Sequence, residues 1–100
     1  MQFLITAYDG KDSEAPARRA KVRPQHLEEV KVLADEGKVL YGAAILDDEG
    51  NMIGSIMVVD FPSLEALKSD WFNKEPYVVG DVWKEIDIKP CKVSDIFLQK

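Results

Sequence analysis

The order of strand-like and helix-like segments constrains the fold of this 100-residue chain most strongly. Short runs rich in β-branched and aromatic residues are typical of strands, and apolar residues at spacings of three and four are typical of helices. In chain order the segments are strand, helix, strand, strand, helix, strand. This order predicts a ferredoxin-like α+β fold, β-α-β-β-α-β, with both helices on one face of a four-stranded antiparallel sheet. The expected strands are 2–8, 39–46, 52–61 and 81–90, and the expected helices are 24–36 and 63–72.

Proline and glycine set the expected ends of the first helix. Pro24 is expected in its first turn, and Gly37 is expected to stop it. The preceding residues 9–21 have Gly, Pro, Asp and Ser without a clear period, which predicts a long loop. Ser63 is expected to cap the second helix. Residues 92–98 are expected to form an extended piece or a tail that packs on the domain.

The third expected strand carries apolar residues on both of its faces. Ile56, Met57, Val58 and Val59 are consecutive, and successive side chains of a strand point to opposite faces. The two helices cover only one face of the sheet. We therefore expect a homodimer in which two subunits pack sheet to sheet. Without repeats or a boundary, residues 1–100 are expected to form a single domain.

Charge and composition exclude several classes of function. The net charge of −5 argues against binding nucleic acid by phosphate neutralisation, and it gives no attraction to anionic membranes. No window approaches the ~20 apolar residues of a membrane span, and residues 1–10 do not resemble a signal peptide. Cys91 is the single cysteine, so no intrachain disulfide forms. A cytoplasmic location is expected.

The motifs of cofactor and metal sites are missing from the sequence. There is no glycine-rich nucleotide loop, no pair of metal-binding histidines and no EF-hand spacing. The surroundings of Ser55 lack the glycines of a nucleophile elbow, so a nucleophilic serine is not expected. We expect neither a cofactor nor a metal.

His26 is the only histidine, and it is the natural proton carrier at neutral pH. As a residue in the first turn of the expected helix, it would lie in a field that favours the neutral ring. The alternative is a surface or capping histidine without function. Glu75 precedes Pro76 and Tyr77; a carboxylate there can orient a histidine, or it can be a solvated loop acid.

Four further residues have a binding interpretation beside a structural one. Arg23 is three residues before His26 and can hold an anion, or it is an ordinary surface charge. Ser55 can present a hydroxyl to a cleft, or it is simply small. Tyr77 and Trp83 can wall a pocket for an aromatic molecule, although core or dimer packing is the commoner role of such a tryptophan.

Several segments together resemble the YciI-like, or YCII-related, proteins. They are RPQHLEEVKVLADEGKVL (23–40), GSIMVVDF (54–61), SLEAL (63–67) and EPYVVGDVWKEIDIKP (75–90), in the order of that family. The resemblance implies a ferredoxin-like fold that dimerises as an α+β barrel, with a histidine and an acidic residue near a cleft. It also implies activities such as dehydrochlorination of chlorinated aromatic compounds. The family usually has Asp where this chain has Glu75, which either retunes the site or removes its chemistry.

The resulting functional hypothesis is a small cofactor-free enzyme. His26 and Glu75 would carry proton-transfer chemistry, either isomerisation or elimination such as dehydrohalogenation. Arg23, Ser55 and Tyr77 would bind a small anionic or phenolic molecule. The alternative is a non-catalytic module that binds a metabolite or a protein partner.

Overall fold

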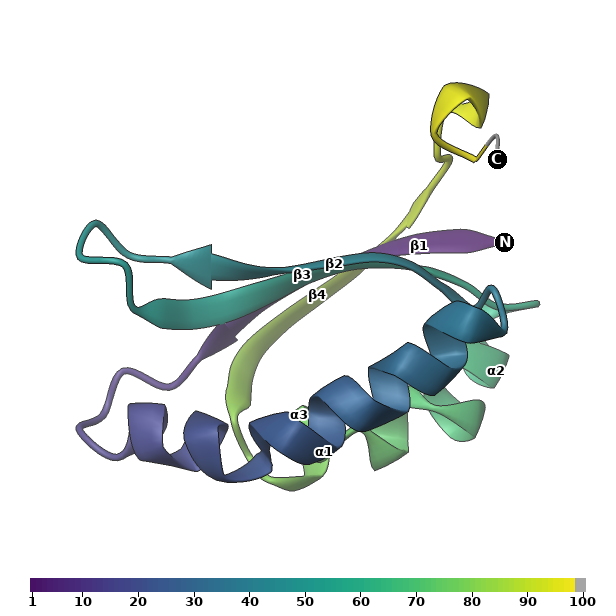
Figure 1. Cartoon of the computed structure of the whole chain (residues 1–100). Helices are drawn as coiled ribbons and strands as arrows, with labels where there is room; N and C mark the ends of the chain where they lie inside the picture. The colour runs from purple at the N-terminus through teal and green to yellow at the C-terminus, as the bar shows by residue number, and fades with distance from the viewer. Residues whose placement is uncertain (99–100) are drawn as a thin grey trace.

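The computed structural model describes residues 1–98 and has the predicted ferredoxin-like fold (Figure 1). One antiparallel sheet has the strand order β2-β3-β1-β4. Helices α1, α2 and the short α3 pack on one face of it. The bounds are β1 (Gln2–Asp9), α1 (Ala15–Asp35), β2 (Val39–Leu46), β3 (Met52–Asp60), α2 (Leu64–Asp70), α3 (Pro76–Val79) and β4 (Trp83–Cys91).

The core lies between the sheet and the helices. Alternate residues of the central strand β1, namely Phe3, Ile5 and Ala7, are at most 2% exposed. Phe3 pairs with Val59 and Ile5 with Met57 on β3, so these side chains share the inner face. The helical segments add apolar side chains to this core: Leu67, Trp71, Phe72 and Tyr77.

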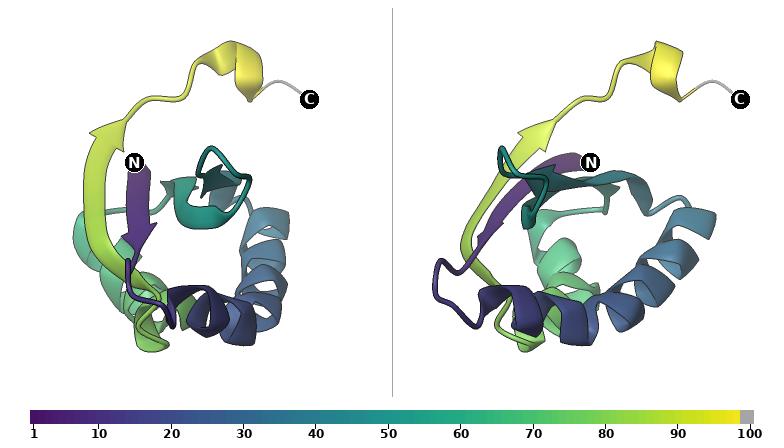
Figure 2. Two further views of the ribbon diagram at one scale, coloured as in Figure 1. Left: turned by 90° about the vertical axis from the view of Figure 1, so that its left-hand side faces the viewer. Right: turned by 60° about the vertical axis from the view of Figure 1, so that its left-hand side comes forward.

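The outer face of the sheet is apolar around β3, as the sequence predicts, whereas most β4 residues on this face are charged. Leu4 pairs with Val58, and Ile56 and Tyr41 share their face in the strand register. Helices α1 to α3 all lie on the opposite face (Figures 1 and 2). Tyr41 is 63% exposed. The structure therefore leaves an apolar surface where the sequence predicts a second subunit, and the homodimer stays a prediction.

Helix α1 begins at Ala15, so the prediction of a loop over 9–21 is wrong. The buried face of its first half consists of Ala15, Arg19, Val22 and His26, at helical spacings of four, three and four. Two of these four residues are polar, so the face has no apolar period. Pro24 lies inside the helix. It removes one backbone hydrogen bond, and α1 bends in its middle (Figures 1 and 2).

The connection between α2 and β4 is helical as well. It contains a 3-10 turn, η1 (Phe72–Lys74), and the single-turn helix α3, and β4 starts at Trp83. Glu75 caps α3, because its carboxylate accepts a hydrogen bond from the Tyr77 backbone N–H at 3.1 Å. The predicted cap of α2 is confirmed: Ser63 Oγ accepts from the Ala66 N–H at 3.1 Å.

The structure tests two further predictions, the end of the first helix at Gly37 and the packing of residues 92–98. Gly37 follows α1 with a φ of +78°, which a glycine adopts without strain, and the predicted stop is confirmed. After β4 the chain forms the 3-10 turn η2 (Asp95–Phe97), which projects from the domain (Figure 1). Ile96 and Phe97 are largely exposed, so the expected packing of 92–98 is not observed. Within residues 1–98 no helix is long and apolar enough to cross a membrane.

Candidate functional site

A pocket of about 330 Å³ lies between α1 and the strands β2 and β3. Four residues singled out in the sequence line it: Arg23, His26, Ser55 and Tyr77. A second hollow of about 490 Å³ is lined by residues of the β1–α1 and β2–β3 connections. The two hollows share Arg19 and Arg23, so they adjoin along α1. Apolar residues complete the wall of the first pocket, among them Leu27, Val30, Val39 and Met57.

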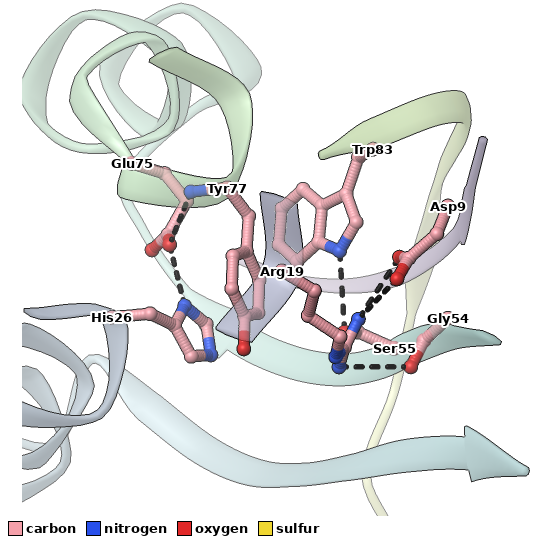
Figure 3. A network of polar contacts seen from close by, with 8 residues as sticks. All are labelled: Asp9, Arg19, His26, Gly54, Ser55, Glu75, Tyr77 and Trp83. Atoms are coloured by element: carbon pink, nitrogen blue, oxygen red, sulfur yellow. Dashed lines mark hydrogen bonds and ion pairs between the residues drawn. The ribbon is translucent and has the colours of Figure 1, made fainter. Parts of the chain in front are cut away.

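His26 and Glu75 are in contact although 49 positions separate them (Figure 3). The distance between His26 Nδ1 and Glu75 Oε1 is 2.5 Å. His26 is 8% exposed and Glu75 is fully buried. The carboxylate lies behind the ring and is not among the residues that line the pocket.

Three donors hold the Glu75 carboxylate in this buried place. Oε1 accepts from His26 Nδ1 and from the Tyr77 backbone N–H, and Oε2 accepts from Trp71 Nε1 at 3.1 Å. Donors of this number stabilise a buried carboxylate in its ionised form. These contacts hold the Glu75 carboxylate against His26.

This pairing determines which nitrogen of His26 is available for chemistry. An ionised carboxylate only accepts hydrogen bonds, so His26 Nδ1 carries the proton. Within residues 1–98 no hydrogen bond reaches Nε2, and that atom is not among the buried polar atoms without a partner. Nε2 of the neutral ring thus presents a lone pair to the pocket. It is the geometry of a general base.

The expected position of His26 in the first turn of a helix is wrong. It lies in the middle of the longer helix α1, so a helix N-terminus does not determine its protonation. The ring instead stacks on Tyr77, with centroids 4.0 Å apart and an angle of 16° between the planes. Its environment is thus set by Glu75 behind and Tyr77 beside it.

Tyr77 connects the histidine to a second polar cluster. The guanidinium carbon of Arg19 lies 4.7 Å from the centre of the tyrosine ring. Burial raises the pKa of the Tyr77 phenol, and the nearby guanidinium groups of Arg19 and Arg23 only partly oppose this. The phenol therefore stays neutral at physiological pH and can donate a hydrogen bond.

Arg19 organises the second cluster, and sequence reasoning did not identify it. Its Nη1 donates to both carboxylate oxygens of Asp9 at 2.9 and 3.0 Å. Its Nη2 donates to the Gly54 carbonyl at 3.2 Å and to Ser55 Oγ at 3.0 Å (Figure 3). Trp83 Nε1 also donates to Ser55 Oγ, at 3.2 Å. A helix predicted from Ala15 would have placed Arg19 four and seven residues before Arg23 and His26, on one face.

The surroundings of Arg23 fit its binding interpretation, whereas those of Trp83 fit its structural one. Arg23 is exposed, lines both hollows and forms no salt bridge within residues 1–98, so its charge is available to an anion. Trp83 is 4% exposed and packs on Phe72, as the structural interpretation expects. Its indole N–H nevertheless belongs to the polar cluster. The described residues contain no group of three or more acidic, histidine or cysteine side chains that could hold a metal.

Comparisons of sequence place this chain beside known proteins. The family model described as the YCII-related domain matches residues 1–92. Protein YciI of Escherichia coli O6:H1 is 34% identical over 98 residues, covering 92% of this chain and 97% of that protein. An uncharacterized protein of Haemophilus influenzae is 35% identical with the same coverage of both chains.

Solved structures share the fold. One is TftG, the 5-chloro-2-hydroxyhydroquinone dehydrochlorinase of Burkholderia phenoliruptrix in complex with 2,5-dihydroxybenzoquinone. It is similar with a TM-score of 0.78 and 20% identity, over 96% of this chain and 98% of that one. Protein Atu4242 of Agrobacterium tumefaciens has a TM-score of 0.52 at 16% identity, over 94% of each chain. At 20% and 16% identity, these two similarities show a shared fold alone.

Proposed function

This chain belongs to the YCII-related family, and from that premise we propose that it is a small-molecule enzyme whose chemistry is proton transfer by His26. The observation that carries the proposal is the 2.5 Å contact between His26 Nδ1 and the buried Glu75, with Nε2 at the pocket. A carboxylate on one ring nitrogen makes the other a better proton acceptor, because it stabilises the imidazolium that forms.

The proposed reaction begins when His26 Nε2 takes a proton from the substrate. Negative charge then develops on the substrate, and Arg23 at the pocket wall stabilises it. Return of the proton to another atom of the substrate completes an isomerisation. Departure of a halide ion with its bonding electrons completes an elimination. Glu75 remains an acceptor throughout and is a positioning residue.

The pocket and the structural neighbour indicate the class of substrate. A volume of about 330 Å³ is at the small end of ligand pockets and suits a molecule with one ring. TftG is named for a chlorinated hydroxyhydroquinone and was solved with a dihydroxybenzoquinone. We therefore propose a phenolic or otherwise anionic ring compound, with dehydrohalogenation as the first reaction to assay.

Turnover by His26→Ala tests the proposal. Across chlorinated hydroquinones, chlorophenols and lactones, we expect it to lose about 10²- to 10⁴-fold in kcat/KM on any compound that the wild type converts. Gln25→Ala, an exposed neighbour on the same helix, is the matched control and should keep wild-type turnover. Equal turnover by His26→Ala and the wild type would refute catalysis by His26. Binding without turnover by either would favour the alternative, a metabolite-binding module.

The homodimer and the cytoplasmic location belong to the same proposal. The apolar part of the outer face, with Ile56 and Val58 beside the exposed Tyr41, supports sheet-to-sheet packing of two subunits. The single cysteine, Cys91, supports a reducing compartment. Sedimentation equilibrium should give twice the chain mass of 11.3 kDa. A monomer at micromolar concentration would refute the dimer.

A further inference from the structure

The hydroxyl of Ser55 has its two acceptor positions occupied. Arg19 Nη2 donates to Ser55 Oγ at 3.0 Å and Trp83 Nε1 donates to it at 3.2 Å. Guanidinium and indole groups have no acceptor, so both contacts use lone pairs of the serine oxygen. The single hydrogen of the hydroxyl must then point elsewhere. Ser55 lines the pocket beside His26 and Tyr77, and within residues 1–98 its hydroxyl donates to no acceptor.

The groups that fix Ser55 are themselves rigid. Arg19 and Asp9 are both buried and form an ion pair in which Arg19 Nη1 donates to both carboxylate oxygens, and Trp83 is packed between Phe72 and Tyr77. The Gly54 carbonyl accepts a further hydrogen bond from Arg19, and a Cβ at Gly54 would lie 2.5 Å from the Ala7 carbonyl oxygen. Strand β3 is therefore held at this position by close packing against β1, and Oγ cannot turn away from its two donors without loss of both contacts.

We propose that Ser55 is an obligate hydrogen-bond donor to an oxygen of the substrate, held in that role by Arg19, Asp9 and Trp83. The proposal rests on the proposed function and adds the chemistry of the ligand. The bound molecule carries a phenolate or carbonyl oxygen at Ser55, while His26 Nε2 faces its acidic proton. Two donors on Oγ polarise the O–H bond, which strengthens its interaction with an oxygen that gains negative charge. Arg19, Asp9 and Trp83 are positioning residues.

The same cluster has a second unused donor. Arg19 Nε is buried and has no hydrogen-bond partner within the described residues. A buried N–H without a partner costs free energy, but this nitrogen has almost no accessible surface, so a molecule in the pocket does not reach it. The selection of ligands therefore depends on the hydrogen of Ser55. A ligand that presents only N–H or C–H groups to Ser55 leaves that hydrogen without an acceptor.

Binding of two matched probes tests this donor role. 4-Nitrophenolate, formed from 4-nitrophenol under mildly alkaline conditions, has an oxygen anion, and 4-nitrotoluene has a methyl group in its place. In Ser55→Ala we expect the affinity for 4-nitrophenolate to fall about 10- to 100-fold, as for the loss of a hydrogen bond to a charged acceptor, while that for 4-nitrotoluene stays within about twofold. The exposed Ser69→Ala on α2 is the control and should leave both affinities unchanged.

Trp83→Phe separates positioning from packing. It keeps a ring in the core but removes one donor to Ser55 Oγ, so the hydroxyl gains a second orientation. We expect a loss of about 2- to 10-fold in affinity for 4-nitrophenolate and none for 4-nitrotoluene. A purely structural role would lower both affinities together. Equal affinities of wild type and Ser55→Ala for 4-nitrophenolate would overturn the proposal, and so would a wild type that does not prefer it to 4-nitrotoluene. These are binding measurements with His26 and Glu75 intact, so their failure is distinct from a failure of the turnover test.

Discussion

Replacing Glu75 by Gln nearly preserves the shape of the side chain but removes its negative charge. The wild-type carboxylate offers acceptors on both oxygens, and three donors converge on it: His26 Nδ1, the Tyr77 N–H and Trp71 Nε1. A glutamine has one oxygen and one NH₂ group. Its most favourable orientation keeps the oxygen toward His26 and Tyr77, which turns the NH₂ group toward the indole N–H of Trp71.

The expected cost follows from these contacts. The hydrogen bond from Trp71 is lost, and two N–H donors then face each other, which costs about 1–3 kcal/mol. The hydrogen bonds from His26 and Tyr77 remain, but they lose the strength that an ionised acceptor gives them. Removal of a buried negative charge offsets part of this loss. We expect a net decrease of about 1–3 kcal/mol in the free energy of unfolding. For a chain of 100 residues this corresponds to a thermal midpoint about 5–20 °C lower.

Urea unfolding followed by tryptophan fluorescence measures this decrease, and turnover measures the second effect. Without the carboxylate the imidazolium is no longer stabilised, so we expect kcat to fall about 10²- to 10⁴-fold in the folded variant. Glu49→Gln, in the exposed β2–β3 turn, is the matched control and should change neither quantity. A Glu75→Gln variant with wild-type stability and wild-type turnover would refute the role of this carboxylate.

Three further changes test other parts of the structure. Because burial raises the pKa of Tyr77, alkaline absorbance titration should show a late-ionising phenol that Tyr77→Phe removes; an unchanged titration curve would contradict its burial. The side-chain hydrogen bonds from Arg18 lower the pKa of Asp12 from 3.8 to about 2 in the folded state, so this pair stabilises the fold above about pH 4 and the contribution is lost as the pH falls toward 2. The difference in unfolding free energy between wild type and Asp12→Asn should shrink over that range, and a constant difference would be contrary evidence. Pro24→Ala restores a backbone N–H and should straighten α1, with turnover reduced about tenfold or more but helical circular dichroism retained; full activity would show that the bend is not needed.

The strands and the overall topology were predictable because each strand has a clear physical signature. The inner residues of β1 alternate with outer ones, and the consecutive apolar residues 56–59 of β3 require two apolar environments. Gly37 and Ser63 marked helix ends through their backbone preference and hydroxyl. These signals are local, so the sequence alone is sufficient to read them.

The first half of α1 was not predictable by the same route. Its buried face includes Arg19 and His26, whose burial depends on partners outside the helix: Asp9 at the end of β1, and Glu75, 49 positions from His26. An apolar period cannot report a face that is buried through polar contacts. Pro24 then suggested a helix start where the structure has a bend. The missed helix and the missed residue Arg19 therefore have one cause.

The site was predictable in part. The resemblance to YCII-related proteins pointed to His26 and Glu75, and only the fold shows that their side chains meet. Glu75 is an uncommon cap residue, so neither its contact with Tyr77 nor the helix α3 was expected. For Ser55 the sequence left two interpretations open, a hydroxyl at a cleft or simply a small residue. Its direction as a donor became evident only from Arg19 and Trp83, which reach it from two other elements.

The ¹⁵N resonances of the single histidine, measured under conditions where its ring is neutral, report most directly on the His26–Glu75 pair. We expect a protonated Nδ1 that donates to Glu75 and an unprotonated Nε2, and we expect this preference to weaken in Glu75→Gln. A neutral ring that carries its proton on Nε2 in the wild type would contradict the pairing, and with it the assignment of Nε2 as the base.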